Sequence, residues 1–398
     1  MVIGVNLVPW QRVENMASLT HLGQYWSASR RELRILGGNG LEISPQGQSL
    51  ARAWDLTDCL ALPSHRRNFS RENREAGWEA ARWTCSGLPT PMVELVEWLE
   101  SRQLRVGEWA AGFCPQEQGA EELDFSSLGT SPLPDSDHLV APVIPRRAQA
   151  FGVTYLNSAL ERETEGSRGD YGFVYRAVKE RGERPELFLK GTSPEHFVGP
   201  GGRMGLRTDL TNSEDMEGNS CNREVVSAGI EPELAAVVHS DGRIWGYTLA
   251  NDVSGNRMEN ETLLYLYQAK HFTGALVLGP LILLSDNQSN PNLDIRTRIL
   301  AAGGEELFER ESNSSNINAP IGDLVSWAAS HIRLQPAEVF STGTNVVPDG
   351  LVKVLSEGMT VQISCPEIGL LSHGAGPVED GSELNPDYAR LQFEGGGE

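Results

Sequence analysis

Residues 231–252 read EPELAAVVHSDGRIWGYTLAND, and this stretch predicts a β-hairpin. Two runs rich in apolar and β-branched residues flank Asp241-Gly242, a dipeptide typical of two-residue hairpin turns. With such a turn, Glu231 faces Asp252 across the ladder, and Glu233 lies two residues along on the same side of the sheet. The hairpin is therefore expected to bring three carboxylates together.

These three carboxylates indicate a site for a hard divalent cation. Opposed side chains in an antiparallel pair lie roughly 5 Å apart at Cβ, and like charges there destabilise the sheet. All-oxygen ligands favour Mg²⁺, Mn²⁺ or Ca²⁺ over zinc, and three protein ligands leave positions for water and a chelating substrate. The alternative is a solvated polar face, because strands commonly alternate polar and apolar residues. The polar break at 253–257, directly after the last acid, favours the cation site.

The composition is that of a globular chain and argues against several classes of protein. The chain has 398 residues, of which 39% are hydrophobic and 22% charged, and its formal net charge is −21. Because nucleic-acid binding needs a basic surface, we expect no nucleic-acid partner. The longest apolar run, 272–284, is too short to span a bilayer, so we expect no membrane partner. The five cysteines show no C-x-x-C spacing, which favours a reducing, cytoplasmic setting over a zinc or redox site.

Shifts in composition predict four parts of the chain. We expect a small N-terminal α+β domain at 1–125, a linker at 126–138, a catalytic domain at 139–376 and an acidic, poorly ordered tail at 377–398. The Ser, Gly, Pro and Asp residues of the second part are typical of linkers.

Strands dominate from residue 230 onward, so the predicted fold class is α+β and mostly β. Apolar spacing predicts helices at 90–102 and 323–331, and a second hairpin is expected at 361–371. The acidic stretch 207–222 lacks periodicity, and we interpret it as a mobile lid or a disordered insertion.

Eight short motifs occur in a fixed order between residues 140 and 375. They are Gly152-Val-Thr-Tyr155, Leu160-Glu-Arg162, Arg184-Pro-Glu-Leu-Phe-Leu-Lys190, Glu231-Pro-Glu233-Leu-Ala-Ala-Val-Val238, Gly246-Tyr-Thr-Leu-Ala-Asn-Asp252, Leu264-Tyr-Leu-Tyr-Gln-Ala-Lys270, Gly279-Pro280 and Thr342-Gly-Thr344. Together they resemble the fumarylacetoacetate hydrolase superfamily, and within it the 2-keto-3-deoxy-pentonate (arabinonate or xylonate) dehydratases. The resemblance does not extend to residues 1–125.

The resemblance implies a rolled β-sandwich around a divalent cation, usually Mg²⁺. An E-x-E pair and a later aspartate hold the cation in that family, and these positions are Glu231, Glu233 and Asp252 here, the three residues that the hairpin register brings together. It also implies a dehydratase, a hydro-lyase that acts on a 2-keto-3-deoxy sugar acid through a metal-stabilised enolate. The alternatives are a C–C bond hydrolase or decarboxylase of an acylpyruvate or other β-dicarbonyl compound, and a protein that keeps the fold but only binds a small carboxylate or a partner.

The resemblance also implies roles for five further residues. Lys270 would be a base or enolate donor, and Glu161 would be a catalytic acid or base. Arg162, Thr344 and Lys190 would bind substrate, the arginine through a bidentate contact with a carboxylate. The structural alternatives are a snorkelling lysine, a salt-bridged helix face and a hydroxyl that closes a turn.

Three departures from the family pattern lie around the metal ligands and leave the ligands themselves intact. Ser254-Gly-Asn-Arg257 replaces Ser-x-Arg-Asp, and Gly199-Pro-Gly201 replaces Gly-His-Gly. The stretch between Asp209 and Glu231 is longer than in those relatives. We expect a small-molecule 2-oxo acid substrate as partner, and a homodimer or homotetramer.

Overall fold

The computed structural model describes two long stretches of the chain, residues 19–155 and 183–377. Within them it leaves out 31, 45–46, 61, 63–89, 130–131, 133–134, 215–219, 227, 262, 286–289 and 349. The expected tail at 377–398 lies outside the described residues except for its first residue.

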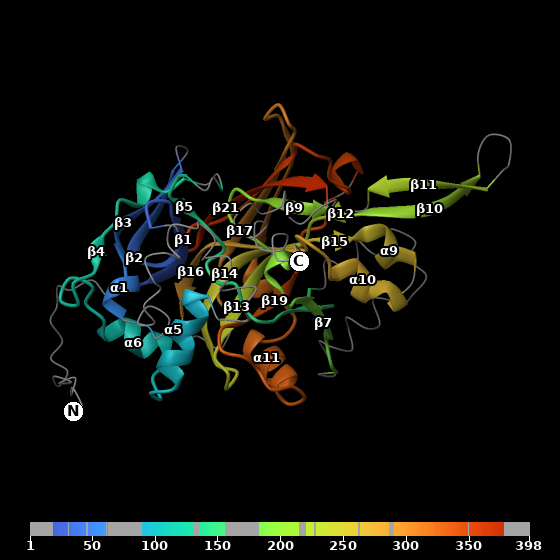
Figure 1. Cartoon of the computed structure of the whole chain (residues 1–398). Helices are drawn as coiled ribbons and strands as arrows, with labels where there is room; N and C mark the ends of the chain where they lie inside the picture. Colours follow the sequence, from blue (N-terminus) through green and yellow to red (C-terminus); the bar gives the residue numbers. More distant parts are fainter. Residues whose placement is uncertain are drawn as a thin grey trace, which may run out of the picture.

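Twelve strands of the described residues form one large sheet of mixed direction (Figure 1). Ten of them follow each other across the sheet, with β5 and β8 attached at β1 and β16. In sheet order they are β4 (Glu121–Glu122), β3 (Gly47–Asp55), β2 (Glu32–Ser44), β1 (His21–Ser27), β16 (Leu276–Leu284), β14 (Ile244–Asp252), β13 (Pro232–Val238), β19 (Glu338–Thr344), β6 (Ala148–Gly152) and β7 (Glu186–Gly191), with β5 (His138–Leu139) and β8 (Phe197–Val198) attached.

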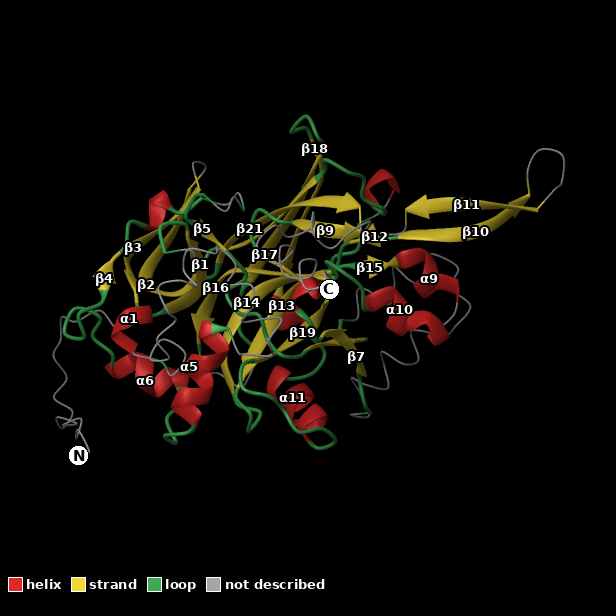
Figure 2. Cartoon of the chain, in the orientation of Figure 1, coloured by secondary structure: helices red, strands yellow, loops and turns green. Residues whose placement is uncertain are grey.

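A second sheet packs against one face of the first. Its strands are β18 (Glu306–Asn313), β17 (Asp294–Leu300), β20 (Thr360–Cys365), β21 (Gly369–Pro377) and β9 (Arg203–Leu206), in that order. The hairpin β20–β21 confirms the prediction for 361–371. Figure 2 shows that strands dominate both layers, so the predicted mostly β sandwich is confirmed.

The helices of the described residues are short, and the predicted helices are confirmed as α5 and α11. They are α1 (Thr57–Leu60), α5 (Pro91–Glu100), α6 (Val106–Gly112), α9 (Asn256–Glu261), α10 (Leu266–Lys270) and α11 (Ile321–Ala329), with single 3₁₀ turns at Phe125–Ser127, Pro194–His196, Leu263–Tyr265, Ser314–Asn316 and Gly350–Val352. No helix in the described ranges has the length and apolar character that crossing a bilayer requires.

The described residues on either side of 215–219 have regular backbone structure that the sequence did not predict. Strands β10 (Thr208–Glu214) and β11 (Ser220–Val226) pair antiparallel, and Figure 1 shows the hairpin projecting from the sandwich. The interpretation of 207–222 as a disordered insertion is therefore wrong. A second small pair joins β12 (Ala228–Gly229) to β15 (Ser254–Gly255), just outside the hairpin β13–β14.

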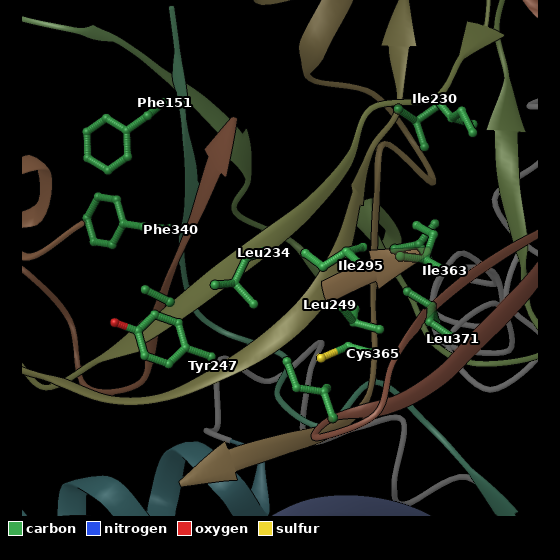
Figure 3. Close-up of a cluster of buried hydrophobic side chains, with 14 of the residues drawn as sticks. Phe151, Ile230, Leu234, Tyr247, Leu249, Ile295, Phe340, Ile363, Cys365 and Leu371 are labelled. Carbon is green, nitrogen blue, oxygen red and sulfur yellow. The ribbon is translucent and has the colours of Figure 1, made fainter. Parts of the chain in front are cut away.

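Apolar side chains cover both faces of the large sheet. Between the two sheets, Leu234 and Leu249 from β13 and β14 pack with Ile363 and Leu371 from β20 and β21 (Figure 3). The opposite face of the large sheet packs against α5 and α6. Every residue of β13 and β14 is buried. Since neighbouring residues of a strand point to opposite faces, both faces of these two strands are covered.

The N-terminal strands belong to the same sheet as the rest of the chain. Strand β1 pairs with β16, and α5 and α6 pack against the same face as Ala235 and Val237 of β13. A domain boundary between 125 and 139 stays a prediction, and the shared sheet and core argue against an independently folded N-terminal part.

A group of charges surrounds the buried Arg34 side chain in the N-terminal part of the chain, and we call it the Arg34 cluster. It consists of Arg34, Asp55, Glu32, Asp58 and Tyr25. The Arg34 side chain is 1% exposed, contacts Asp55 and Glu32, and lies 2.8 Å from Asp58 Oδ2. The Tyr25 hydroxyl donates to Asp55 Oδ2 at 2.7 Å. One guanidinium therefore neutralises several acids in a region without a candidate site residue.

Candidate metal centre

Strands β13 and β14 pair in the register that the sequence predicts. Pro232 faces Asn251 in the ladder, and the Asp252 N–H donates to the Glu231 carbonyl at 2.9 Å. Since side chains alternate between the faces of a strand, Glu231, Glu233 and Asp252 lie on one face. The predicted register is confirmed.

The turn of this hairpin differs from the prediction. A three-residue loop, Ser240 to Gly242, replaces the expected two-residue turn, and the His239 N–H donates to the Arg243 carbonyl at 2.9 Å. Gly242 has a φ of +85°, a conformation that suits glycine in such loops. The ladder then skips Trp245 in a bulge, which restores the predicted register for the rest of the hairpin. The two irregularities offset each other, so the acids still meet.

The three acids form a compact group that we call the carboxylate cluster. One oxygen each from Glu231, Glu233 and Asp252 lies within 4.8 Å of the other two. Glu233 is 2% exposed and Asp252 is fully buried, whereas the Glu231 side chain is 15% exposed. A single ion can therefore contact all three acids, and Glu231 lies on the side that solvent reaches.

Two buried lysines lie against the carboxylate cluster. Lys190, near the end of β7, has its Nζ 2.6 Å from Asp252 Oδ1 and donates to the Val253 carbonyl at 2.8 Å. Lys270, the last residue of α10, has its Nζ 2.9 Å from Glu231 Oε2 and 3.5 Å from Asp252 Oδ2. The lysines predicted for substrate binding and for catalysis thus both reach the cluster.

A buried hydroxyl completes the surroundings of Lys270. The Lys270 ammonium donates to Ser254 Oγ at 2.5 Å, and Ser254 is fully buried directly after the metal-site hairpin. The Ser254 hydroxyl in turn donates to the Asp252 carbonyl at 3.2 Å. Lys270 is therefore held in place by an acid and a hydroxyl from two different segments.

Strand β19 holds Glu233 from the other side. The Ser341 hydroxyl donates to Glu233 Oε2, and the Gly343 N–H donates to the same oxygen at 2.8 Å. Gly343 has a φ of +93°, and a Cβ atom there would lie 1.9 Å from Thr154 Oγ1. Glycine is therefore required at this position to place the N–H on Glu233.

Thr344 lies beside the cluster with its hydroxyl engaged by backbone. It faces Glu233 in the ladder between β19 and β13. Its Oγ1 lies 2.8 Å from the Pro232 carbonyl and 3.1 Å from both the carbonyl and the N–H of Val346. These contacts fit the turn-closing role, and substrate binding by Thr344 stays a prediction.

Burial shifts the ionisation of the acids and of one lysine. The pKa of Glu233 is raised well above its usual range by burial and by the charges of Asp252 and Glu231. The pKa of Asp252 is also raised, because burial outweighs the attraction of Lys190 and Lys270. Burial lowers the pKa of Lys190 in spite of Asp252. An additional positive charge would therefore stabilise the ionised form of the acids.

The donor set of the carboxylate cluster fits a divalent cation. Neither oxygen of Asp252 has a hydrogen bond of good geometry within the described residues, although Lys190 and Lys270 lie beside them. Lys190 and Lys270 form ion pairs with Asp252, at 2.6 Å from Oδ1 and 3.5 Å from Oδ2. Two ammonium groups face three carboxylates, and the raised pKa values of Glu233 and Asp252 indicate that the lysines do not fully compensate the buried negative charge. Carboxylate oxygens are the ligands that Mg²⁺, Mn²⁺ and Ca²⁺ prefer.

The structure does not describe every predicted site residue, and some residues of the site were not predicted. Glu161 and Arg162 lie outside the described residues. The residues that contact the cluster or its neighbours without having been singled out are Asn251, Ser254, Ser341 and Gly343. Gly343 lies inside the motif Thr342-Gly-Thr344, and Asn251 directly precedes Asp252. Both residues therefore belong to motifs of the family resemblance, which implied roles only for their neighbours.

Comparison with known proteins identifies relatives for most of this chain. The family model described as fumarylacetoacetate (FAA) hydrolase C-terminal matches residues 183–374. A probable 2-keto-3-deoxyxylonate dehydratase of Haloferax volcanii is 34% identical over 61% of this chain and 76% of that protein. A 2-dehydro-3-deoxy-D-arabinonate dehydratase of Saccharolobus solfataricus is 32% identical over 63% of this chain and 78% of that protein.

Solved structures share the fold. A 2-keto-3-deoxy-D-arabinonate dehydratase complexed with magnesium and 2,5-dioxopentanoate superposes with a TM-score of 0.59 at 22% identity, covering 90% of this chain and 99% of that one. A fumarylacetoacetate hydrolase from Exiguobacterium antarcticum superposes with a TM-score of 0.54 at 16% identity, covering 90% of this chain and all of that one. At these identities the likeness concerns the fold alone.

Proposed function

Since this chain belongs to the fumarylacetoacetate hydrolase family, we propose that it is a divalent-metal-dependent dehydratase of a 2-keto-3-deoxy sugar acid. The observation that carries the proposal is the carboxylate cluster, with a buried lysine on either side of Asp252. The dehydratases of Haloferax volcanii and Saccharolobus solfataricus, which align with most of this chain, support the reaction class. In the reaction a proton leaves C3, and the hydroxyl of C4 takes up a proton and leaves as water.

The acids of the cluster would hold Mg²⁺, with Mn²⁺ or Ca²⁺ as alternatives. When bound to Glu231, Glu233 and Asp252, the cation would polarise the carbonyl of the 2-oxo acid and stabilise negative charge on its oxygen. Ser341 and Gly343 fix the Glu233 carboxylate by two hydrogen bonds, so this ligand is oriented in advance.

We assign the proton transfer at C3 to Lys270. Its Nζ lies at the solvent-reached side of the cluster, beside Glu231, and is held by the Ser254 hydroxyl at 2.5 Å. The fully buried Lys190 has its Nζ directed at Asp252 and at the Val253 carbonyl. We therefore propose that Lys190 orients Asp252 and attracts the anionic substrate through its charge, and that direct contact with substrate is left to other groups.

Three predicted roles complete the proposal. Glu161 would give the proton to the departing C4 hydroxyl, and Arg162 would bind a carboxylate bidentately. Thr344 would present its backbone and hydroxyl to the substrate carboxylate. We also propose a cytoplasmic homodimer or homotetramer, and the free thiols of Cys59, Cys114 and Cys365 agree with a reducing compartment.

Product analysis tests the proposed reaction. The purified protein is incubated with Mg²⁺ and either 2-keto-3-deoxy-pentonates or acylpyruvates, and the products are followed by mass spectrometry, with Glu233→Gln as the matched control. Loss of one water from the sugar acid, absent in the variant, is the expected result. Cleavage of an acylpyruvate into two fragments, or release of CO₂, would instead identify a C–C hydrolase or a decarboxylase. Binding without turnover of either compound would contradict every enzymatic role.

A further inference from the structure

A fully buried amide lies immediately before the last metal-site acid, on the opposite face of its strand. Asn251 is 0% exposed, and its side chain points away from Asp252, toward the second sheet. The Asn251 Oδ1 accepts the backbone N–H of Glu231 at 3.0 Å. Its Nδ2 lies 3.2 Å from Nε2 of His373 on β21, and 3.7 Å from the Met204 sulfur. Every polar atom of this amide therefore has a partner.

These partners also fix the protonation of His373. Because the Glu231 N–H can only donate, the amide oxygen must face it, and the Asn251 NH₂ group must face His373. The His373 Nε2 is then an acceptor, and its Nδ1 carries the proton and donates to the Gly374 carbonyl at 3.0 Å. His373 is 1% exposed, so water cannot replace either contact. A neutral imidazole with a defined tautomer thus sets the orientation of Asn251.

The chain of hydrogen bonds ends on the most exposed acid of the carboxylate cluster. Glu231 precedes the first residue of β13, and the next residue, Pro232, has no N–H to donate. Within the ladder the Glu231 carbonyl accepts from Asp252, and its N–H is taken by Asn251. The backbone of Glu231 is therefore fixed at its N–H by a side chain, whereas Glu233 lies inside a regular strand with β19 beside it.

We propose that Asn251 is a positioning residue of the metal centre: it fixes the backbone of Glu231, and His373 holds Asn251 in the required orientation. The inference rests on the proposed metal site and concerns neither the substrate nor the reaction. It makes the packing of the second sheet part of the metal centre, because His373 lies on β21 and reaches Asn251 across the sandwich.

Metal affinity distinguishes positioning from a purely structural tie between the sheets. Mn²⁺ binding is measured by electron paramagnetic resonance of the free ion, and the melting temperature of each metal-free variant is recorded beside it. Asn251→Leu removes the amide contacts at similar volume, and His373→Phe removes the acceptor for Asn251 together with the hydrogen bond to the Gly374 carbonyl. His373→Gln keeps an acceptor near the place of Nε2. Thr248→Val is the matched control, because Thr248 is a fully buried residue of the same strand whose hydroxyl donates to the Gly279 carbonyl, away from the carboxylate cluster.

Outer partners of metal ligands commonly contribute about 10–100-fold to metal affinity, so Asn251→Leu and His373→Phe are expected to raise the Kd for Mn²⁺ by about 10-fold or more. His373→Gln should bind within a few-fold of the unchanged protein, and Thr248→Val should bind equally well even if its melting temperature falls. An unchanged Kd in His373→Phe, or in Asn251→Leu, would overturn the inference and leave the metal centre standing. No Mn²⁺ binding by the unchanged protein would overturn the proposed metal centre and the inference with it.

Discussion

The carboxylate cluster and the Arg34 cluster both contain buried charged side chains, yet they are built in opposite ways. In the Arg34 cluster one guanidinium contacts three acids, and Asp55 also accepts from the Tyr25 hydroxyl and the Thr57 N–H. Burial alone would raise the pKa of Asp55, but these partners outweigh it and hold the pKa below its usual range. In the carboxylate cluster burial prevails, and the pKa values of Glu233 and Asp252 rise.

The difference shows which kind of buried charge indicates a functional site. Burial and charge are common to both clusters, so neither property separates them. The Arg34 cluster satisfies Asp55, whereas both Asp252 oxygens lack a well-formed hydrogen bond in the described part of the chain. A buried acid whose pKa stays raised next to other acids, in spite of two ammonium groups, indicates a place for a further positive charge. The following experiments test whether one cluster serves stability and the other serves binding.

Arg34→Met should have the largest effect, on stability alone. Breaking a buried ion pair leaves Asp55 uncompensated, so the free energy of unfolding should fall by about 3–5 kcal/mol. Urea unfolding followed by circular dichroism measures it, and the double variant Arg34→Met/Asp55→Leu should recover most of the loss. An unfolding free energy equal to that of the unchanged protein would mean that the Arg34 cluster contributes nothing to stability.

Glu233→Gln should lower activity strongly and leave the stability of the metal-free protein intact. Loss of a metal ligand should lower kcat/KM by more than about 100-fold, since even the outer partners of ligands contribute up to that factor. The melting temperature of the metal-free variant should stay equal or rise, because a neutral amide removes like-charge repulsion from a buried site. Steady-state kinetics and calorimetry measure the two quantities. A large fall in melting temperature without metal would assign Glu233 the structural role that we give to Arg34.

Added Mg²⁺ should stabilise the protein through the carboxylate cluster and not through the Arg34 cluster. At a concentration of 100 times its Kd, a ligand that binds only the folded state stabilises it by about 2.7 kcal/mol. The unfolding free energy of the unchanged protein should rise by that amount, and so should that of Arg34→Met. Glu233→Gln should gain little. If all three proteins respond equally, the ion binds somewhere other than the carboxylate cluster.

Lowering the pH should reduce the contribution of the Arg34 cluster to the free energy of unfolding. This effect should be the smallest of the four predicted effects. Because the folded pKa of Asp55 is lowered, its contribution is complete above the unfolded pKa of about 3.9 and is lost as the pH falls through the folded value. The slope from one group is at most about 1.4 kcal/mol per pH unit. Urea unfolding between pH 6 and pH 2 measures it against Arg34→Met/Asp55→Leu, which should lack this component. If the unfolding free energy of both proteins falls with the same slope, Asp55 does not contribute to the loss of stability in acid.

The sequence predicts the carboxylate cluster because it depends on local register. Glu231, Glu233 and Asp252 are separated by one hairpin, and periodicity within a strand is enough to place them on one face. The prediction used a two-residue turn, and it holds because the longer loop and the bulge at Trp245 cancel. Turn length and bulges depend on contacts with other elements, such as the bonds from His239 and Ser240 to Glu100 of α5, and these are not visible in the hairpin sequence.

Contacts between distant segments could not be predicted in the same way. Ser341 and Gly343 reach Glu233 from more than a hundred positions away. The sequence did not indicate the Arg34 cluster, because Asp55 and Asp58 come from β3 and α1, more than twenty positions after Arg34. The N-terminal strands were expected as a separate unit, since nothing in their sequence indicates that β1 pairs with β16. The stretch 207–222 was read as irregular, because polar strands that pair only with each other lack the alternation that identifies half-buried strands.

The two lysines beside the acids have a consequence for the order of events. With all five groups ionised, three carboxylates and two ammonium groups give the metal-free centre a formal charge of minus one, which would repel an anionic keto acid. A doubly charged ion would reverse that sign to plus one, so electrostatics would favour a sequence in which the ion enters before the keto acid. On a chain whose formal net charge is −21, the ion would thus make this centre attractive to anions.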